Sequence, residues 1–353
     1  FISTKIRGGG AERVVAVLSS ALAELGYCVD LILYERYDDE YSISSKVNIH
    51  MLPQKKNGSK ALYLINKFFK LRGIISKLQP DILIPFLPYQ VEHTYFASRG
   101  LDIPMVVTVR NNPQYDTPNE KMRKRRDRIA EKVEGVFLQT ESQKSYFPER
   151  IKDKCFVVPN PVDNSVLNST YSPKKSIKKL VSVGRLSLQK NQKILIKTIY
   201  ELRKQNYDIY LDIYGIGELN SQLKAQIEEL DLTGIVSLRG RSNDIANTLT
   251  NYDMFVMTSD YEGMPNALIE AMCVGIPVVS TKVSGAVDLI EDGVNGRLVD
   301  CNNVEALSQV LSELLNDYAL SESYAEKSIL LNEKLKAKQI VKNWLDYIEE
   351  VIK

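Results

Sequence analysis

The chain has 353 residues, of which 44% are hydrophobic and 25% are charged. This length accommodates about two domains, and the composition is typical of a soluble globular enzyme. No apolar run approaches the ~18 residues that a membrane-spanning helix needs, and no segment has the pattern of a signal peptide, so we expect neither an integral membrane protein nor a secreted one.

The net charge of +2 hides an uneven distribution. Residues 1–160 carry 25 Lys and Arg against 18 Asp and Glu, whereas residues 161–353 carry 21 against 26. Many of the first part's cations lie on one short segment, namely Lys121, Arg123, Lys124, Arg125, Arg126, Arg128 and Lys132. Such a segment can attract anionic lipid or a pyrophosphate-linked acceptor, which predicts peripheral membrane contact, or it can be an ordinary solvated helix face.

Cysteine and histidine are sparse. Neither the four cysteines nor the two histidines have metal-ligand spacing, so we expect no structural zinc. Scattered cysteines in hydrophobic settings indicate reduced core thiols and a cytoplasmic protein. These residues are Cys28, Cys155, Cys273, Cys301, His50 and His93.

The first part alternates strands with helices. Residues 1–4 read as the end of a strand, so we expect a few residues to precede them. Gly8 to Gly10 follow, and then a helix over 11–26 with apolar residues at a period near 3.6. Further strands are expected at 28–34, 81–86, 105–109 and 135–139. This alternation predicts a parallel sheet covered by helices on both faces.

A hinge is expected at 159–179, because Pro159 and Pro161 each remove a backbone donor and restrict the preceding residue. A second alternating series follows. It has strands at 180–183, 209–214, 236–238, 254–257 and 277–280, helices at 189–205 and 218–230, and a helical end from about 303 in two or three pieces.

The strongest motif runs from Ser259 to Met272, between two hydrophobic strands. Pro265 suits the first turn of a helix, which places Glu262 in the preceding loop and Glu270 on the helix. The N–H groups at this helix start form a natural anion site, at the sheet edge where ligands of doubly wound folds bind. The two carboxylates could accept hydrogen bonds from sugar and ribose hydroxyls, or they could be plain surface residues.

A second strand, loop and helix carries Gly184, Arg185 and Lys190. Glycine lets the backbone pass close to a ligand. Two cations near a helix start are unfavourable for the helix dipole, and a bound diphosphate would compensate them through charge-assisted hydrogen bonds. The alternative is ordinary surface charge.

Three glycine segments are weaker signals. Tyr214 to Glu218 contains Gly-x-Gly without the third glycine of a nicotinamide fingerprint. Leu238 to Arg241 could flank a base or form a plain turn. Gly8 to Arg13 lacks the spacing of a nucleoside triphosphatase loop, but it suits a glycine turn that a ligand can approach.

Together these segments resemble the retaining glycosyltransferases of family 4, over nearly the whole chain. The resemblance rests on Gly-Gly-Ala-Glu-Arg at 9–13, Pro-Asn-Pro-Val-Asp at 159–163, Gly-Arg-x4-Lys-Asn at 184–191 and Glu-x7-Glu at 262–270. It implies an α/β protein of the GT-B fold, with two Rossmann-like domains whose parallel sheets face each other across a cleft. The implied domains are an acceptor-side domain at 1–160, onto which helix 338–353 with Trp344 packs back, and a donor-binding domain at 161–337.

The resemblance also implies site residues. Arg185, Lys190 and Glu262 would be catalytic, the cations on the donor diphosphate and Glu262 on the transferred sugar, while Glu270 would hold the ribose. The full implied donor site is Gly9, Gly10, Gly184, Arg185, Lys190, Tyr214, Gly240, Arg241, Glu262, Gly263, Met264, Asn266, Ala267, Leu268 and Glu270.

Many family members have a histidine near the reacting sugar, at a strand end of the N-terminal domain. Here His93 lies downstream of strand 81–86, past Pro88, so its assignment to that role competes with a structural one. Arg110 and Asn111, after strand 105–109, are equally placed for the sugar or the acceptor.

We therefore predict a cytoplasmic, or peripherally membrane-associated, retaining transferase. It would move a hexose or N-acetylhexosamine from a UDP-sugar, or a GDP-sugar, to a growing glycan or lipid-linked acceptor, with no metal, no cofactor and no nucleic acid partner. The alternatives are a sugar-nucleotide epimerase or hydrolase on the same fold, a non-catalytic nucleotide-sugar-binding subunit and, least favoured, a nicotinamide oxidoreductase.

Overall fold

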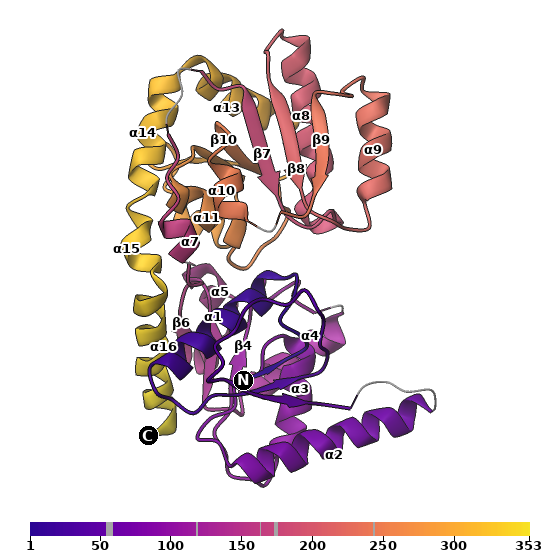
Figure 1. Ribbon diagram of the computed structural model, residues 1–353, viewed down its shortest axis with the longest axis vertical. Helices are drawn as coiled ribbons and strands as arrows, with labels where there is room; N and C mark the ends of the chain where they lie inside the picture. The colour runs from indigo at the N-terminus through magenta and orange to yellow at the C-terminus, as the bar shows by residue number, and fades with distance from the viewer. Residues whose placement is uncertain (54–58, 118, 163, 173–175, 243) are drawn as a thin grey trace. The chain divides into compact units, whose positions relative to one another are not determined.

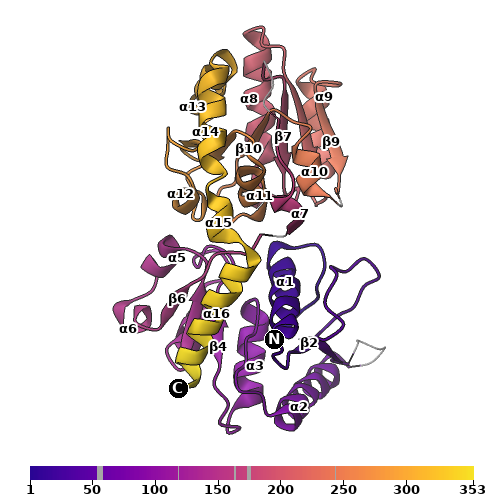
Figure 2. The same cartoon turned by 60° about the vertical axis from the view of Figure 1, so that its left-hand side comes forward.

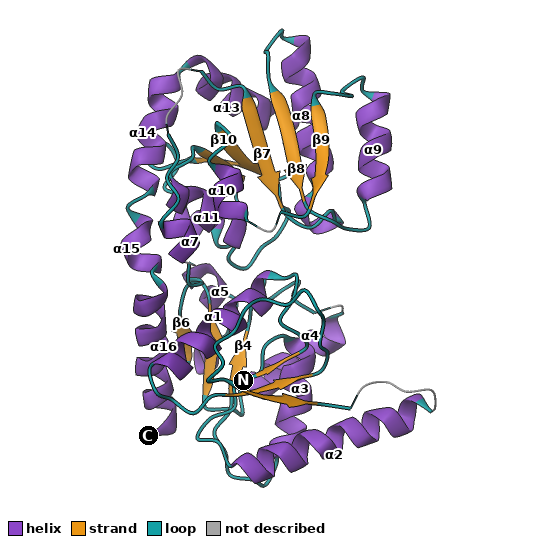
Figure 3. Cartoon of the chain, in the orientation of Figure 1, coloured by secondary structure: helices purple, strands orange, loops and turns teal. Residues whose placement is uncertain are grey.

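The computed structural model describes residues 1–53, 59–117, 119–162, 164–172, 176–242 and 244–353. The chain divides into two compact units (Figure 1). Unit 1 consists of Phe1–Pro161 with the final segment Ala337–Lys353, and unit 2 is Val162–Lys336. Each unit is a parallel α/β layer structure in the described residues (Figure 3).

Unit 2 is built on a parallel sheet of six strands in the order β12-β11-β10-β7-β8-β9. The chain starts in the middle at β7, moves outward through β8 and β9, returns to the other side of β7 at β10 and moves outward again. This is the order of a doubly wound fold, with its switch point between β7 and β10. The strands are β7 Lys179–Val183, β8 Tyr210–Tyr214, β9 Val236–Gly240, β10 Met254–Met257, β11 Val278–Thr281 and β12 Arg297–Val299.

The helices of unit 2 cover the two faces of this sheet. In α8 the fully buried Leu195, Ile199 and Leu202 follow the helical period and face the core, and the helix packs against α13. The helices are α7 Asn164–Leu167, the 3-10 turn η1 Leu188–Lys190, α8 Gln192–Lys204, α9 Asn220–Glu229, α10 Ile245–Leu249, α11 Asn266–Val274, α12 Ala286–Leu289, α13 Val304–Asn316, α14 Tyr318–Ser328 and α15 Leu331–Leu335.

Unit 1 contains two three-stranded parallel sheets, β1-β2-β3 and β4-β5-β6. Residues 83–86 lie between them, because Ile2 pairs with Pro85 and Leu83 with Met105 as isolated bridges. Phe86 N–H donates to the carbonyl of Ile2 (2.8 Å), so the two sheets continue into each other. The strands are β1 Ile2–Ser3, β2 Asp30–Leu33, β3 Asn48–Met51, β4 Val106–Thr108, β5 Gly135–Leu138 and β6 Cys155–Val157.

Helices of unit 1 form two groups. α1 packs against α16 (Figure 2), while α3 packs against both α2 and α4. On α16 the fully buried Trp344 stacks on Phe137 with ring centroids 4.3 Å apart, which ties the chain's last helix to β5. The helices are α1 Gly10–Glu24, α2 Lys60–Leu78, α3 Pro88–Ser98, α4 Glu120–Ala130, α5 Glu141–Ser145, α6 Glu149–Lys152 and α16 Ala337–Ile352.

Several expectations from the sequence need correction. The strand expected at 81–86 forms only bridges, and β3, β6 and β12 were not expected. The helical end comprises four helices, α13 to α16, rather than two or three. All four cysteines are free, and Cys155 and Cys273 are buried, but Cys28 is exposed and so is not a core thiol. Within the described residues, no helix is both long and apolar enough to span a bilayer.

Candidate functional site

The switch point of unit 2 brings together two loops that are distant in the sequence. The loop after β7 leads through η1 into α8, and the loop after β10 leads into α11. They are joined by backbone and side-chain hydrogen bonds: Asp260 N–H donates to the carbonyl of Gln189 (2.8 Å), and the Thr258 hydroxyl donates to the carbonyl of Asn191 (3.1 Å). Both strong sequence motifs therefore lie at one sheet edge, where doubly wound folds bind ligands.

Lys190 and Glu262 form an ion pair at this edge. Lys190 Nζ lies 2.5 Å from Glu262 Oε1, and the exposed fractions of the two side chains are 19% and 8%. Gln189 Nε2 donates to the carbonyl of Tyr261 (2.9 Å) and lies 3.4 Å from Glu262 Oε2. A nearly buried carboxylate thus has one cation as its charge partner. Gln189 was not among the expected site residues, although its neighbour Lys190 was.

The backbone around Lys190 is held by side-chain amides. Asn191 adopts a left-handed conformation (φ +46°) and its Nδ2 donates to Asp260 Oδ1 (2.9 Å) and to Asn302 Oδ1 (2.8 Å). Asn tolerates this conformation better than most residues. The β7 loop is thereby anchored to the β10 loop, and to residues after β12, at the point where Lys190 leaves it.

Arg185 differs from Lys190. Its side chain is exposed, and among the described residues its guanidinium has no hydrogen-bond or ion-pair partner. Its carbonyl accepts a hydrogen bond from Gln192 Nε2 (2.8 Å), so the backbone is ordered while the cation stays available. An exposed cation in the loop that also carries Lys190 is free to bind an anion, and the anion site itself stays a prediction.

Helix α11 begins beside Glu262. Pro265 is its N-cap residue, Gly263 and Met264 are buried, and Asn266 and Ala267 are half-buried. The N–H of Leu268 already donates to the carbonyl of Pro265 (3.1 Å). Leu268, an expected ligand, therefore has its N–H engaged in the helix's own first turn. Glu270 is 6% exposed.

Three glycines let loop backbones touch around this site. A Cβ on Gly215 (φ +153°) would lie 1.8 Å from the carbonyl oxygen of Gly184, and one on Gly217 would lie 2.1 Å from that of Leu186. The Gly-x-Gly segment therefore packs directly against the β7 loop. A Cβ on Gly285 (φ +78°) would similarly lie 2.3 Å from the carbonyl oxygen of Gly263, and the sequence motifs did not indicate this contact.

Three other expected donor residues lie at the ends of β8 and β9. The Tyr214 hydroxyl lies 3.0 Å from that of Tyr252, which donates to Asp212 Oδ2 (2.6 Å). Tyr214 is therefore engaged in a hydroxyl cluster on the sheet. Gly240 has φ +73° and its carbonyl accepts from Gly215 N–H (2.7 Å), while Arg241 is exposed.

In unit 1, Gly9 and Gly10 follow β1, with Gly9 as the N-cap residue of α1 and Gly10 as its first residue. Gly8 takes up the positive φ (+76°) of this turn. Asp163, the last residue of the motif at 159–163, lies outside the described residues, whereas Asn160 of the same motif is buried.

Arg110 follows β4 and is held in an unusual environment. Its Nη2 donates to Asn160 Oδ1 (2.5 Å), and its guanidinium lies 5.3 Å from the centre of the Phe86 ring. Nε and Nη1 are buried without a hydrogen-bond partner, and no described carboxylate pairs with the charge. Burial lowers the pKa of Arg110 to about 9.

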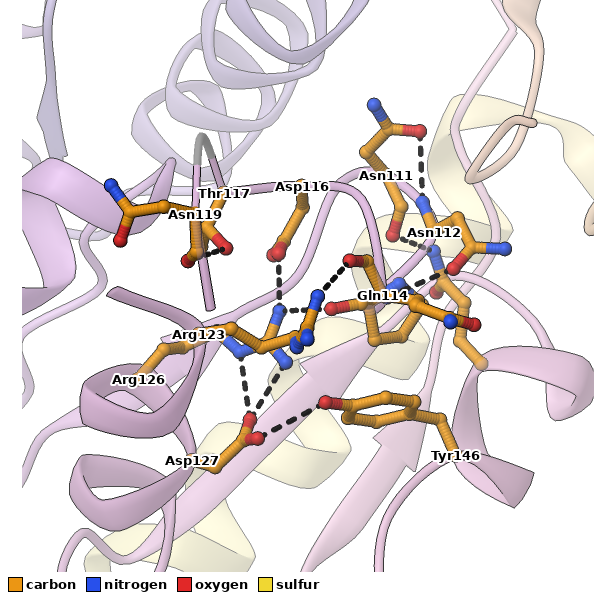
Figure 4. Close-up of polar contacts among 12 residues, drawn as sticks. Asn111, Asn112, Gln114, Asp116, Thr117, Asn119, Arg123, Arg126, Asp127 and Tyr146 are labelled. Carbon is orange, nitrogen blue, oxygen red and sulfur yellow. Dashed lines mark hydrogen bonds and ion pairs between the residues drawn. The ribbon is translucent and has the colours of Figure 1, made fainter. Parts of the chain in front are cut away.

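The loop that contains Asn111 is held by a buried ion network (Figure 4). Arg126 on α4 is 2% exposed, pairs with Asp116 and Asp127, and donates to the carbonyl of Pro113 (2.9 Å). The carbonyl of Asn111 accepts from Gln143 Nε2 (2.9 Å). Arg126 is therefore a structural residue that orders the loop after β4.

His93 lies in an aromatic cluster. Its Nδ1 is 2.5 Å from the Tyr34 hydroxyl, and its ring stacks on Tyr89 at 5.7 Å and lies 5.9 Å from Phe68. Burial, and then the neighbouring Lys67, lower the pKa of His93 to about 4. The imidazole is thus neutral near pH 7, and its contacts are those of a packing residue.

Within the described ranges, no group of three or more His, Cys, Asp or Glu side chains is arranged to hold a metal ion. Independence from metals remains a prediction.

Comparisons with known proteins identify the family of the chain. The family models for Glycosyltransferase Family 4 and for Glycosyl transferases group 1 match residues 8–166 and 169–330. An uncharacterized glycosyltransferase of Haemophilus influenzae is 29% identical over 348 residues, covering 98% of this chain and 97% of the relative. The Campylobacter jejuni enzyme named GalNAc-alpha-(1->4)-GalNAc-alpha-(1->3)-diNAcBac-PP-undecaprenol alpha-1,4-N-acetyl-D-galactosaminyltransferase is 27% identical over 362 residues, covering 99% and 98%.

Among solved structures, Alr3699/HepE of Anabaena in complex with UDP and glucose has a TM-score of 0.84 at 17% identity, covering 99% of this chain and 98% of that one. At this identity the likeness concerns the fold. With the two family models matched in succession along it, the chain belongs to glycosyltransferase family 4 and is a transferase enzyme of the GT-B fold.

Proposed function

We propose that the protein transfers a hexose or N-acetylhexosamine from a UDP-sugar to a glycan or lipid-linked acceptor, with retention at the anomeric carbon. The observation that carries the proposal is the Lys190–Glu262 pair (2.5 Å) at the switch point of unit 2. The same sheet edge carries the loop with the exposed Arg185 and the start of α11, so positive charge and the carboxylate proposed to bind the sugar come from neighbouring loops.

The chemistry follows from where charge develops. Breaking the bond between the anomeric carbon and the donor phosphate leaves negative charge on the diphosphate. Arg185, Lys190 and the N-terminal end of α11 would stabilise that charge as it forms. These groups supply the electrostatic assistance from the protein itself, and we propose that no metal is needed.

Donor binding would then exchange the partners of Lys190 and Glu262. Lys190 would turn to the diphosphate, and the released carboxylate of Glu262 would accept a hydrogen bond from a hydroxyl of the transferred sugar. Glu270, on α11, would accept a hydrogen bond from the ribose. The pair holds the nearly buried carboxylate in a fixed position until the donor arrives, which pre-organises the site.

The acceptor side is proposed to include Arg110 and Asn111. Arg110 holds a desolvated cation with unsatisfied donors, and a phosphate or a sugar hydroxyl of an acceptor could satisfy them. His93 is a weaker candidate, because its ring is already packed by Tyr34, Phe68 and Tyr89. UDP is preferred to GDP because a neighbour of the same fold was solved with UDP.

We also propose that the protein works at the cytoplasmic face of a membrane. Two relatives of nearly the same length are named for acting on undecaprenol-linked oligosaccharides. An acceptor of that kind is embedded in a bilayer, so its transferase must reach the membrane surface from the water.

A donor screen followed by a transfer assay tests the proposal. At 100 times its dissociation constant, a true donor should stabilise the folded chain by about 2.7 kcal/mol, which a thermal-shift series of UDP- and GDP-sugars would detect. Glu262→Ala should abolish transfer to a glycan acceptor, whereas Glu228→Ala, on the exposed face of α9, should not.

The same assay separates the alternatives. Donor consumption that is independent of an acceptor would indicate an epimerase or hydrolase, and binding without turnover would indicate a non-catalytic subunit. Unchanged transfer by Glu262→Ala would show that the site lies elsewhere.

A further inference from the structure

Helix α2 of unit 1 lies in a long stretch without acidic residues. Between Glu40 and Asp81 the chain has eight Lys and Arg and no Asp or Glu. α2 itself occupies Lys60–Leu78 and runs along the outside of unit 1 (Figure 1). A helix that needed only to be soluble would usually mix charges of both signs, so this composition points to a particular surface role.

The outward face of α2 is apolar. Leu62, Ile65 and Phe69 have exposed fractions of 68%, 52% and 64%, and their separations of three and four residues place them on one helix face. We call these three residues the outer stripe. The opposite face, with Leu71 and Ile75 fully buried, already packs in the core. Single exposed apolar residues are ordinary, but a stripe that the core does not need marks an interaction surface.

Basic residues flank the outer stripe. Among the described residues, Lys70 and Lys77 of α2 have no ion-pair partner. Across the layer, a groove between α3 and α4 adds further cations, with Phe96 (46% exposed) beside them. Its lining is Glu92, Tyr95, Phe96, Arg99, Arg125, Arg128, Ile129 and Lys132, so cations outnumber the single acid.

The basic segment of α4 is less available than its sequence indicates. Lys124 pairs with Glu120, and Arg125 pairs with Glu92. Arg126 is buried on two aspartates, and Arg123 donates to the carbonyl of Gln114 (Figure 4). These internal contacts leave fewer of the cations of α4 available to a partner. The basic surface of α2 is therefore neutralised less than that of α4.

We propose that the outer stripe of α2 inserts into the interface of an anionic phospholipid bilayer, with the helix lying in the membrane plane. Helices that bind in this way carry large apolar residues on one face and Lys or Arg around it, and anionic headgroups attract each nearby cation. The proposal specifies the surface for the membrane contact put forward above, and in that respect it rests on the proposed function.

Vesicle co-sedimentation of the full chain tests the assignment. The wild type should sediment with vesicles that contain phosphatidylglycerol, less with vesicles of phosphatidylcholine alone, and less again as salt is raised. The variant Leu62→Ser/Ile65→Ser/Phe69→Ser should bind the anionic vesicles at least about tenfold more weakly, since each apolar side chain contributes to insertion. The control Leu25→Ser/Leu330→Ser changes exposed apolar residues elsewhere and should bind like the wild type.

Donor binding provides the independent readout. Thermal shift with the donor should be the same for the stripe variant and the wild type, because the stripe lies in unit 1 and outside the proposed donor site. The proposal would be overturned if the stripe variant sedimented with anionic vesicles as well as the wild type does. It would also be overturned if the wild type did not bind anionic vesicles. Wild type that self-associates through the stripe, without binding vesicles, would also overturn it. Failure of the proposed function would instead appear as loss of the donor shift in both proteins.

Discussion

Removing Lys190 should destabilise unit 2 through the carboxylate that it leaves behind. Glu262 has an 8% exposed side chain, and Lys190 is its charge partner at 2.5 Å. After Lys190→Ala the carboxylate keeps the long hydrogen bond from Gln189 Nε2, at 3.4 Å. Breaking one side of a buried pair costs about 3–5 kcal/mol, and the partial exposure of Lys190 (19%) places the expected loss near the lower end, at about 3 kcal/mol.

The reverse change should cost less. In Glu262→Ala the lysine head can move into water on its flexible stem, so we expect a loss of about 1 kcal/mol. The double variant no longer contains the stranded carboxylate and should resemble Glu262→Ala, which gives a coupling energy of about 2–3 kcal/mol in the double-mutant cycle.

Urea denaturation followed by far-ultraviolet circular dichroism measures these free energies of unfolding. The chain's single tryptophan, Trp344, belongs to unit 1, so its fluorescence provides an internal control that follows the other unit. A Lys190→Ala variant within about 0.5 kcal/mol of the wild type, or a cycle in which the two losses add, would refute the reasoning that Glu262 depends on this cation.

Three further outcomes are expected. Trp344→Ala should lower the unfolding free energy of unit 1 by about 3–5 kcal/mol. Trp344→Phe should lower it far less, because the indole N–H has no partner among the described residues. Urea denaturation followed by circular dichroism measures both losses. Arg185→Ala should reduce kcat by about 100-fold or more without a change in urea midpoint, since its side chain is exposed; Lys224→Ala on α9 is the matched control. The pKa of His93 is about 4 in the folded chain against 6.5 for the free side chain. The stability that the neutral ring contributes is therefore present above pH 6.5 and is lost as the pH falls towards 4. Over this range the Tm of His93→Gln should fall less than the Tm of the wild type, and equal slopes of Tm against pH would contradict the assignment of a neutral, packed ring.

The strands and loops that build the donor-side edge could be predicted from the sequence. Lys190 and Glu262 are 72 residues apart, yet each follows a continuous hydrophobic strand and precedes a helix. In a doubly wound sheet, such loops collect at the carboxyl edge near the switch point. The rule concerns topology, so it could be applied without knowing any side-chain contact.

Short edge strands could not be predicted in the same way. The sequence of β3 is Asn-Ile-His-Met, and β12 has three residues with Arg first. Neither has the apolar run or the alternation that indicates a strand. They are strands because β2 and β11 offer them unpaired backbone groups, which only the folded sheet supplies.

The role of a cation in a basic segment also depended on partners that spacing does not reveal. Arg126 is surrounded in sequence by exposed cations, but its own side chain is buried because it pairs with Asp116, ten residues earlier. Similarly, α2 has apolar residues on several sides, which is typical of a buried helix. In the structure Leu71 is fully buried, whereas Leu62 and Phe69 are exposed.

Arg110 and Arg126 show how burial without compensation separates a site residue from a structural one. The guanidinium of Arg126 and the Nε and Nη1 atoms of Arg110 are buried. Arg126 has two carboxylates and a carbonyl, whereas Arg110 has one neutral amide oxygen and the face of the Phe86 ring. A desolvated charge with unsatisfied donors lowers the stability of the fold, so packing alone gives no reason to keep an arginine after β4. Sites that bind charged ligands tolerate such costs because the ligand later supplies the missing acceptors. The uncompensated cation, rather than the cluster of paired ones on α4, is therefore the feature of unit 1 on which the proposed acceptor contact rests.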